Sequence, residues 1–124
     1  MLIGFPTIGS FLISLVSIVV MDVIWFRFLG GQIYPKMNNI NIQYALIPWV
    51  FLAFAISCGK PVDFLESFIY GMFVGLIVFS VFNGTELCIR EDWRKNWYIS
   101  IVDICWGMLV CSATSLISYS TVRP

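Results

Sequence analysis

The chain has 124 residues, of which 60% are apolar and only 11% are charged, with seven basic and seven acidic side chains. A soluble domain of this length carries about 25% charged residues, so the composition excludes an ordinary soluble globule and indicates a polytopic membrane protein. The apolar content also excludes a disordered chain, and the neutral charge balance argues against a nucleic-acid partner. Because the sequence has no histidine, histidine-based catalysis and histidine metal ligands are ruled out. We expect no enzyme activity, no cofactor and no metal site.

Four apolar stretches are candidate membrane spans, because a hydrocarbon core of about 30 Å requires roughly 17–25 mainly apolar residues per helix. They cover about residues 7–29, 42–58, 64–82 and 98–119. Helices are preferred to barrel strands, since the run 73–82 lacks the alternation of lipid-facing strands. The predicted fold class is therefore all-α. We expect a single transmembrane domain over residues 1–124, an up-down bundle of four membrane helices with a polar layer at one end.

The connections between these stretches are short. Residues 30–41 contain several turn formers and predict an irregular loop, and residues 59–61 predict a tight hairpin. In the third connection, 88–97, Ile89, Trp93 and Trp97 fall at i, i+4 and i+8 among charged residues. This spacing is typical of a short amphipathic helix lying in the membrane interface, and a plain charged loop is the alternative.

The distribution of basic residues predicts the orientation, because cytoplasmic loops of membrane proteins carry an excess of Lys and Arg. The side with the first and third connections has five basic residues: Arg27, Lys36, Arg90, Arg94 and Lys95. The other side has two, Lys60 and Arg123. We therefore expect loops 30–41 and 88–97 in the cytoplasm and both termini on the opposite side.

Four polar residues lie within or at the edge of the spans: Asp22, Asn83, Glu86 and Asp103. An ionised acid at the bilayer centre costs about 2.5–3.5 kcal/mol on insertion scales, so such residues usually face a bundle interior or water. In an up-down bundle, the end of span one, the end of span three and the start of span four lie at the same membrane face. The four polar side chains are therefore expected to meet in one layer.

A repeated Asp-x-x-Trp pattern extends this polar layer. Asp22 and Trp25 form one copy, and Asp103 and Trp106 form the other. Residues at i and i+3 share a helix face, so each indole N–H is placed to donate to a carboxylate on a neighbouring helix. The two copies predict a pseudo-symmetric cluster, unless they recur by chance. Arg27 and Tyr34 are further candidate partners.

These residues together resemble the pattern of a known family. They are Asp22-x-x-Trp25, Tyr34, Asn83-Gly84-Thr85-Glu86, Trp97 and Asp103-x-x-Trp106-Gly107. Their order and spacing are similar to those of small, mostly bacterial, four-span membrane proteins of unknown function, over about residues 15–112. The family typically shows Asp-Leu-Thr-Asn where this chain has residues 83–86, so the acid and the amide have exchanged places. The resemblance implies a shared fold and polar cluster, and no activity.

Small residues at four-residue spacing occur on spans three and four, a pattern that allows close approach of helix backbones. They are Ser67, Gly71 and Gly75 on span three, and Gly107, Cys111 and Ser115 on span four. Packing within the chain is the expected use of this pattern, and a dimer interface is the alternative.

Two classes of function remain. The first is a structural or assembly component of a membrane, for example the membrane layer of a virus particle, in which the polar residues hold the bundle together. The second is a small transporter or channel subunit in which Asp22, Glu86 and Asp103 bind a cation or proton. The expected partners are the lipid bilayer and other membrane or capsid proteins or a second copy, and no nucleic acid.

Overall fold

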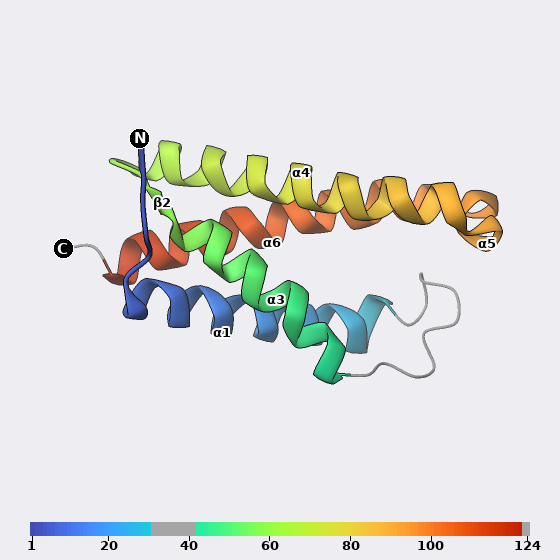
Figure 1. The fold of residues 1–124 in the computed structure, drawn as a ribbon, viewed down its shortest axis with the longest axis horizontal. Coiled ribbons are helices and arrows are strands. Elements are labelled where there is room, and N and C mark those ends of the chain that lie inside the picture. The colour runs from blue at the N-terminus through green and yellow to red at the C-terminus, as the bar shows by residue number, and fades with distance from the viewer. Residues whose placement is uncertain (31–41, 123–124) are drawn as a thin grey trace.

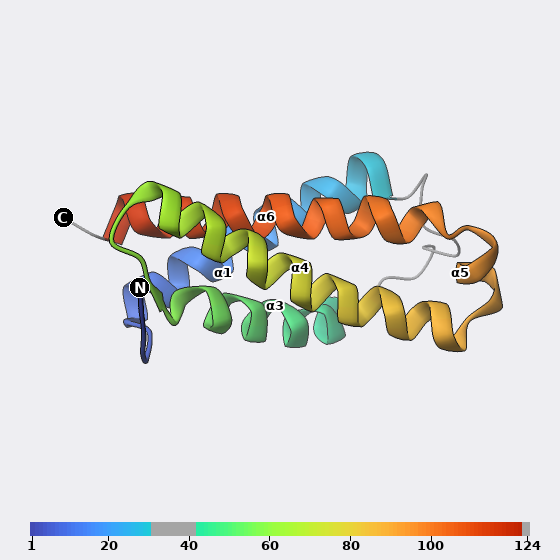
Figure 2. The same ribbon diagram turned by 90° about the horizontal axis from the view of Figure 1, so that it is seen from above.

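The computed structural model describes residues 1–30 and 42–122, and these form long helices that lie side by side along one axis (Figure 1). The elements in chain order are β1 (Leu2–Ile3), α1 (Ile8–Trp25), the π-helix η1 (Phe26–Gly30), α3 (Ile42–Ser57), β2 (Gly59–Lys60), α4 (Phe64–Ile89), α5 (Glu91–Lys95) and α6 (Tyr98–Val122). Helices α1 and α4 run in one direction along the axis, and α3 and α6 run in the other (Figures 1 and 2).

Within the described residues, three helices are long and apolar enough to cross a membrane: Ile8–Phe28, Phe64–Ile89 and Tyr98–Val122. A shorter apolar helix covers Gln43–Cys58. Large apolar side chains such as Val16, Phe51 and Phe73 are exposed, whereas many polar side chains are buried. An apolar exterior around buried polar groups is the arrangement that a lipid environment favours. The chain is an all-α membrane protein, as its composition predicts.

The apolar core lies between α1, α3 and α6. Ile18 of α1, Ala53 of α3 and Val110 of α6 are all 0% exposed, and they belong to one contiguous cluster. Helix α6 is the most buried of the three membrane-length helices. It packs along α4 and against α1, whereas α3 packs mainly against α1.

The packing of α4 against α6 depends on small residues. A methyl group added to Gly71 would lie 2.5 Å from the carbonyl oxygen of Cys111, and one added to Gly75 would collide with the backbone of Gly107. One turn further along, the hydroxyls of Ser67 and Ser115 are hydrogen-bonded at 2.8 Å. The predicted use of the small residues for packing within the chain is confirmed.

Helix α4 ends at Ile89, which is seven residues beyond Phe82, the predicted end of the third span. The apolar run stops at Asn83, but that side chain lies inside the bundle with 1% exposure. The helix ends where Arg90 adopts extended backbone angles, φ −119° and ψ 118°. Asn83 is therefore within the helix rather than at its terminus.

The third connection contains a short helix, as the first of the two predicted forms expects, but with narrower bounds. Only Glu91–Lys95 are helical as α5, Ile89 still belongs to α4, and Trp97 is exposed in a turn. Trp93 is 4% exposed, and its indole N–H donates to the Ser100 hydroxyl at 2.9 Å. Trp93 therefore packs inside the protein against the start of α6, and the position of this segment in the membrane interface stays a prediction. The first connection, 30–41, lies almost entirely outside the described residues.

A two-stranded ladder, which the sequence does not predict, closes the end of the bundle where the chain begins. Leu2 pairs with Lys60 and Ile3 pairs with Gly59 in antiparallel register. The predicted hairpin between spans two and three is therefore partly a strand. A strand of two residues is too short to show a hydrophobic period, so sequence patterns cannot reveal it.

Candidate functional site

Asp22, near the end of α1, is the centre of the candidate site. Its side chain is 7% exposed, and both carboxylate oxygens accept hydrogen bonds from indole N–H groups. Trp49 of α3 donates to Oδ2 at 2.7 Å, and Trp106 of α6 donates to Oδ1 at 3.0 Å. This single carboxylate therefore connects three helices.

Asp103 of α6, 6% exposed, is the second buried acid. The Nδ2 group of Asn83, on α4, donates to its Oδ2 at 2.6 Å and also to the carbonyl oxygen of Phe79 at 2.8 Å. The Oδ1 atom of Asn83 is buried without a hydrogen-bond partner among the described residues. Asn83 thus presents donors to the acid and connects α4 with α6. We call Asp22, Trp49, Asn83, Asp103 and Trp106 the polar cluster.

The two Asp-x-x-Trp copies meet in the structure. Trp25 stacks on Trp106 with ring centroids 4.4 Å apart and planes inclined by 13°. Because Trp106 also donates to Asp22, the acid of the first copy is bonded to the indole of the second.

Glu86 does not join the polar cluster, in contrast to the prediction from the sequence. Its carboxylate accepts from Arg90 at 2.9 Å, and Arg90 also donates to Asp92 at 2.9 Å. The hydrogen bonds that Arg90 donates, first to Asp92 and then to Glu86, raise the pKa of Arg90 above its ordinary value. Since α4 continues past Asn83, Glu86 lies most of a turn further on, beside this basic residue.

The two further candidate partners of the layer also lie elsewhere. Arg27, in η1, is exposed, and within the described part of the chain the structure gives it no ion pair with a cluster acid. Tyr34 lies outside the described residues.

A cavity of about 220 Å³ adjoins the polar cluster. Asp22 and Asp103 both line it, and most of the remaining wall is apolar or aromatic, with contributions from α3 and α4. Among residues 1–30 and 42–122, no group of three or more cysteine and acidic side chains is placed to hold a metal ion. The site therefore combines two buried carboxylates, neutral hydrogen-bond donors and a largely apolar space.

The sequence matches one protein family, described as predicted membrane protein (DUF2177), over residues 7–120. The chain belongs to this family. The resemblance to an uncharacterised family of small membrane proteins is thereby confirmed. No curated protein and no solved structure matches the sequence.

In this DUF2177 member, sequence reasoning missed Trp49. It lies in the middle of the second span, next to Pro48 and among apolar residues, where a tryptophan normally contributes packing. The sequence did contain a signal for this contact. A buried Asp22 needs hydrogen-bond donors, and a buried indole N–H usually finds an acceptor. Trp49 was the one tryptophan inside the second span.

Proposed function

We propose that all four long helices cross the membrane in alternating directions, with loops 30–41 and 88–97 in the cytoplasm. Helix α3, with 16 residues, is the shortest of them. At 1.5 Å per residue it spans roughly 24 Å, and local thinning of the bilayer accommodates such a difference at modest cost. Its midpoint residue Trp49 donates to Asp22, which supports placing α3 at the same depth as its neighbours.

Within this arrangement, the proposed function is that of a structural or assembly component of a membrane. One observation carries this proposal: both oxygens of the Asp22 carboxylate accept from neutral indole donors on two other helices. Both oxygens of this carboxylate already have hydrogen-bond donors, so the group does not need a bound ion as a partner. The polar cluster then serves to specify how the helices pack.

The exterior supports the same role. Many large apolar side chains on the long helices are exposed, so lipid or neighbouring proteins must cover them. In a larger assembly, such as the membrane layer of a virus particle, other membrane or capsid proteins or further copies of this chain would do so. No nucleic acid is part of this proposal.

The test is the stability of Asp22→Asn in detergent. An asparagine can accept from one indole, but its amide group then faces the other indole N–H, so one charge-assisted bond is lost. We expect the free energy of unfolding to fall by about 1.5–3 kcal/mol. The matched control is Glu91→Gln, which changes an acid that is 73% exposed beside Lys95 and should shift stability by less than about 0.5 kcal/mol. Equal stability of both variants and the wild type would contradict the proposal.

The cavity beside Asp22 and Asp103 favours a second candidate, a small transporter or channel subunit that binds a cation or proton. Glu86 has no part in it, because its carboxylate pairs with Arg90. Asp103→Asn is the discriminating variant, since its amide oxygen can still accept from Asn83 and the fold should persist. In reconstituted vesicles, a transporter shows cation or proton flux that this variant abolishes. The structural proposal expects no flux from either protein.

A further inference from the structure

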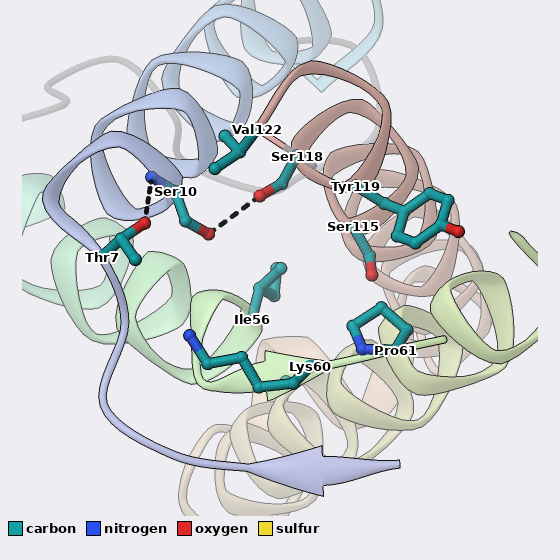
Figure 3. Close-up of a pocket in the computed structure, with 10 residues that line it drawn as sticks. Thr7, Ser10, Ile56, Lys60, Pro61, Ser115, Ser118, Tyr119 and Val122 are labelled. Carbon is teal, nitrogen blue, oxygen red and sulfur yellow. Dashed lines mark hydrogen bonds between the residues drawn. The ribbon is translucent and has the colours of Figure 1, made fainter. Parts of the chain in front are cut away.

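A second cavity, of about 190 Å³, lies at the other end of the bundle, where α1 begins and α6 ends (Figure 3). Thr7 and Ser10 line it from the start of α1, Ser118 lines it from the last turns of α6, and Lys60 lines it from β2. Figure 3 shows the hydroxyls of Ser10 and Ser118 directed toward each other across the cavity, with Lys60 extended along the facing wall. None of these residues belongs to the polar cluster.

The hydroxyl groups of this cavity have protons left to donate. The Thr7 hydroxyl oxygen accepts from the backbone N–H of Ser10 at 3.1 Å, which leaves its own O–H available. The hydroxyls of Ser10 and Ser118 share one hydrogen bond at 3.0 Å. Two hydroxyls have two protons and one bond consumes one of them, so one O–H remains for another acceptor.

The charge of the cavity is positive. Lys60 lines it and forms no ion pair within residues 1–30 and 42–122. The two acids nearby in sequence are engaged elsewhere: Glu66 pairs with the N-terminal ammonium of Met1 at 3.2 Å, and Asp63 accepts from the backbone N–H of Glu66 at 2.8 Å. No acidic side chain is among the lining residues. A cation and spare O–H donors without an acid select for an anion with several acceptor oxygens.

We propose that this cavity binds a phosphate group, carried by a phospholipid headgroup or present as free inorganic phosphate. Lysine binds phosphate as a point charge, and the hydroxyls supply the directional bonds. The cavity lies at the ends of the long helices, and the proposed crossing of the membrane by these helices places it at the level of the lipid phosphates. This site rests on that proposed crossing for its position and is independent of the structural role proposed for the polar cluster.

The experiment measures lipid retention by native mass spectrometry of the full chain in detergent. The probes are dioleoyl phosphatidic acid and dioleoylglycerol, which share acyl chains and differ by the phosphate. We expect the wild type to retain phosphatidic acid and not dioleoylglycerol. Lys60→Gln should weaken retention of phosphatidic acid roughly tenfold, as the loss of one charge-assisted bond implies. Lys60→Arg should preserve it, and Lys95→Gln, a loss of the same charge at the far end, should leave it unchanged.

Two further measurements control for misfolding of the Lys60 variant and identify which phosphate compound is bound. The double variant Ser10→Ala/Ser118→Ala removes the spare O–H of this pair without changing the charge and should weaken retention several-fold, which keeps the test valid if Lys60→Gln does not fold. Sodium phosphate is titrated against sodium chloride at equal ionic strength. If phosphate displaces the lipid, the phosphate site is supported and a soluble anion is an occupant; if it does not, the headgroup is the ligand.

The proposal is overturned if dioleoylglycerol is retained as well as phosphatidic acid, or if both Lys60→Gln and the Ser10→Ala/Ser118→Ala double variant bind phosphatidic acid like the wild type. Asp22→Asn serves to separate this site from the polar cluster. It should lower stability yet leave retention unchanged, so failure of one proposal can be recognised without the other.

Discussion

Asp22 is surrounded by neutral donors rather than by cations. Its two oxygens accept from Trp49 and Trp106, and Asp103 accepts from the amide of Asn83. Hydrogen bonds between helices in membranes average only about 0.6 kcal/mol, whereas bonds to charged groups contribute about 1.5–3 kcal/mol. The acids therefore make these few contacts the strongest polar links between the helices.

The amide and the acid of residues 83–86 each have a structural reason. Asn83 donates to Asp103, which a carboxylate ion at that position could not do. Glu86 pairs with Arg90. Each group lies beside a complementary partner.

Asn83→Leu tests this account at the residue scale. The substitution keeps the branching and the number of heavy atoms of the side chain but removes the donor to Asp103, so the unfolding free energy in detergent should fall by about 1–3 kcal/mol. The matched control is the adjacent Gly84→Ala, because a methyl group at Gly84 meets nothing within 4 Å. This control should be neutral or more stable by up to about 1 kcal/mol. A loss in the control that equals the loss in Asn83→Leu would contradict the role of Asn83.

At the scale of elements, the pairing of α4 and α6 depends on the absence of side chains. Both Gly71 and Gly75 lie against the backbone of α6, where a methyl group would overlap main-chain atoms that cannot rotate away. Tyr70 places a similar demand on Gly59, because its ring occupies the space where a methyl group would project.

Gly71→Ala and Gly75→Ala should each destabilise the protein. The two helices must separate to admit the methyl group, and overpacking of this kind costs about 1–3 kcal/mol. Thermal unfolding in detergent measures the effect, with Gly84→Ala again as the control on the same helix. The account of α4 and α6 would be wrong if Gly71→Ala and Gly84→Ala had the same stability.

The sequence predicts the positions of the long helices well, but it misses the end of α4 and the contact of Trp49. Composition and apolar length locate the long helices, since a lipid environment leaves few other solutions for such stretches. The end of α4 is missed, because Asn83 reads as a span boundary although the structure gives it a partner inside the bundle. Trp49 is missed because an indole among apolar residues looks like packing, and only the fold brings it to Asp22.

At the scale of the whole molecule, the arrangement is polar inside and apolar outside. Asp22, Asn83 and Asp103 are buried, and apolar side chains form much of the exposed surface. The sequence correctly predicts that the acids of α1 and α6 lie close together, because the order of the helices fixes the level of a residue along the bundle. It wrongly adds Glu86 to them, because the packing of α4 decides which neighbours that side chain meets.

The proposed orientation can be tested with two native cysteines at opposite ends of the bundle. Cys58 is partly exposed after α3, and Cys88 is exposed in the last turn of α4. In single-cysteine variants expressed in cells, a membrane-impermeant maleimide added outside should label Cys58 and spare Cys88. Labelling of Cys88 alone would reverse the orientation. Labelling of both from one side would contradict the crossing by α4.

The most direct test of the polar cluster is the spectrum of the indole N–H groups in protein labelled with ¹⁵N-tryptophan and held in detergent micelles. The chain has five tryptophans, so their indole signals can be assigned by single substitutions. The account predicts that Asp22→Asn shifts the signals of Trp49 and Trp106 and leaves that of the exposed Trp97 in place. If the Trp49 and Trp106 signals did not move, Asp22 would not be their acceptor and the account would be wrong.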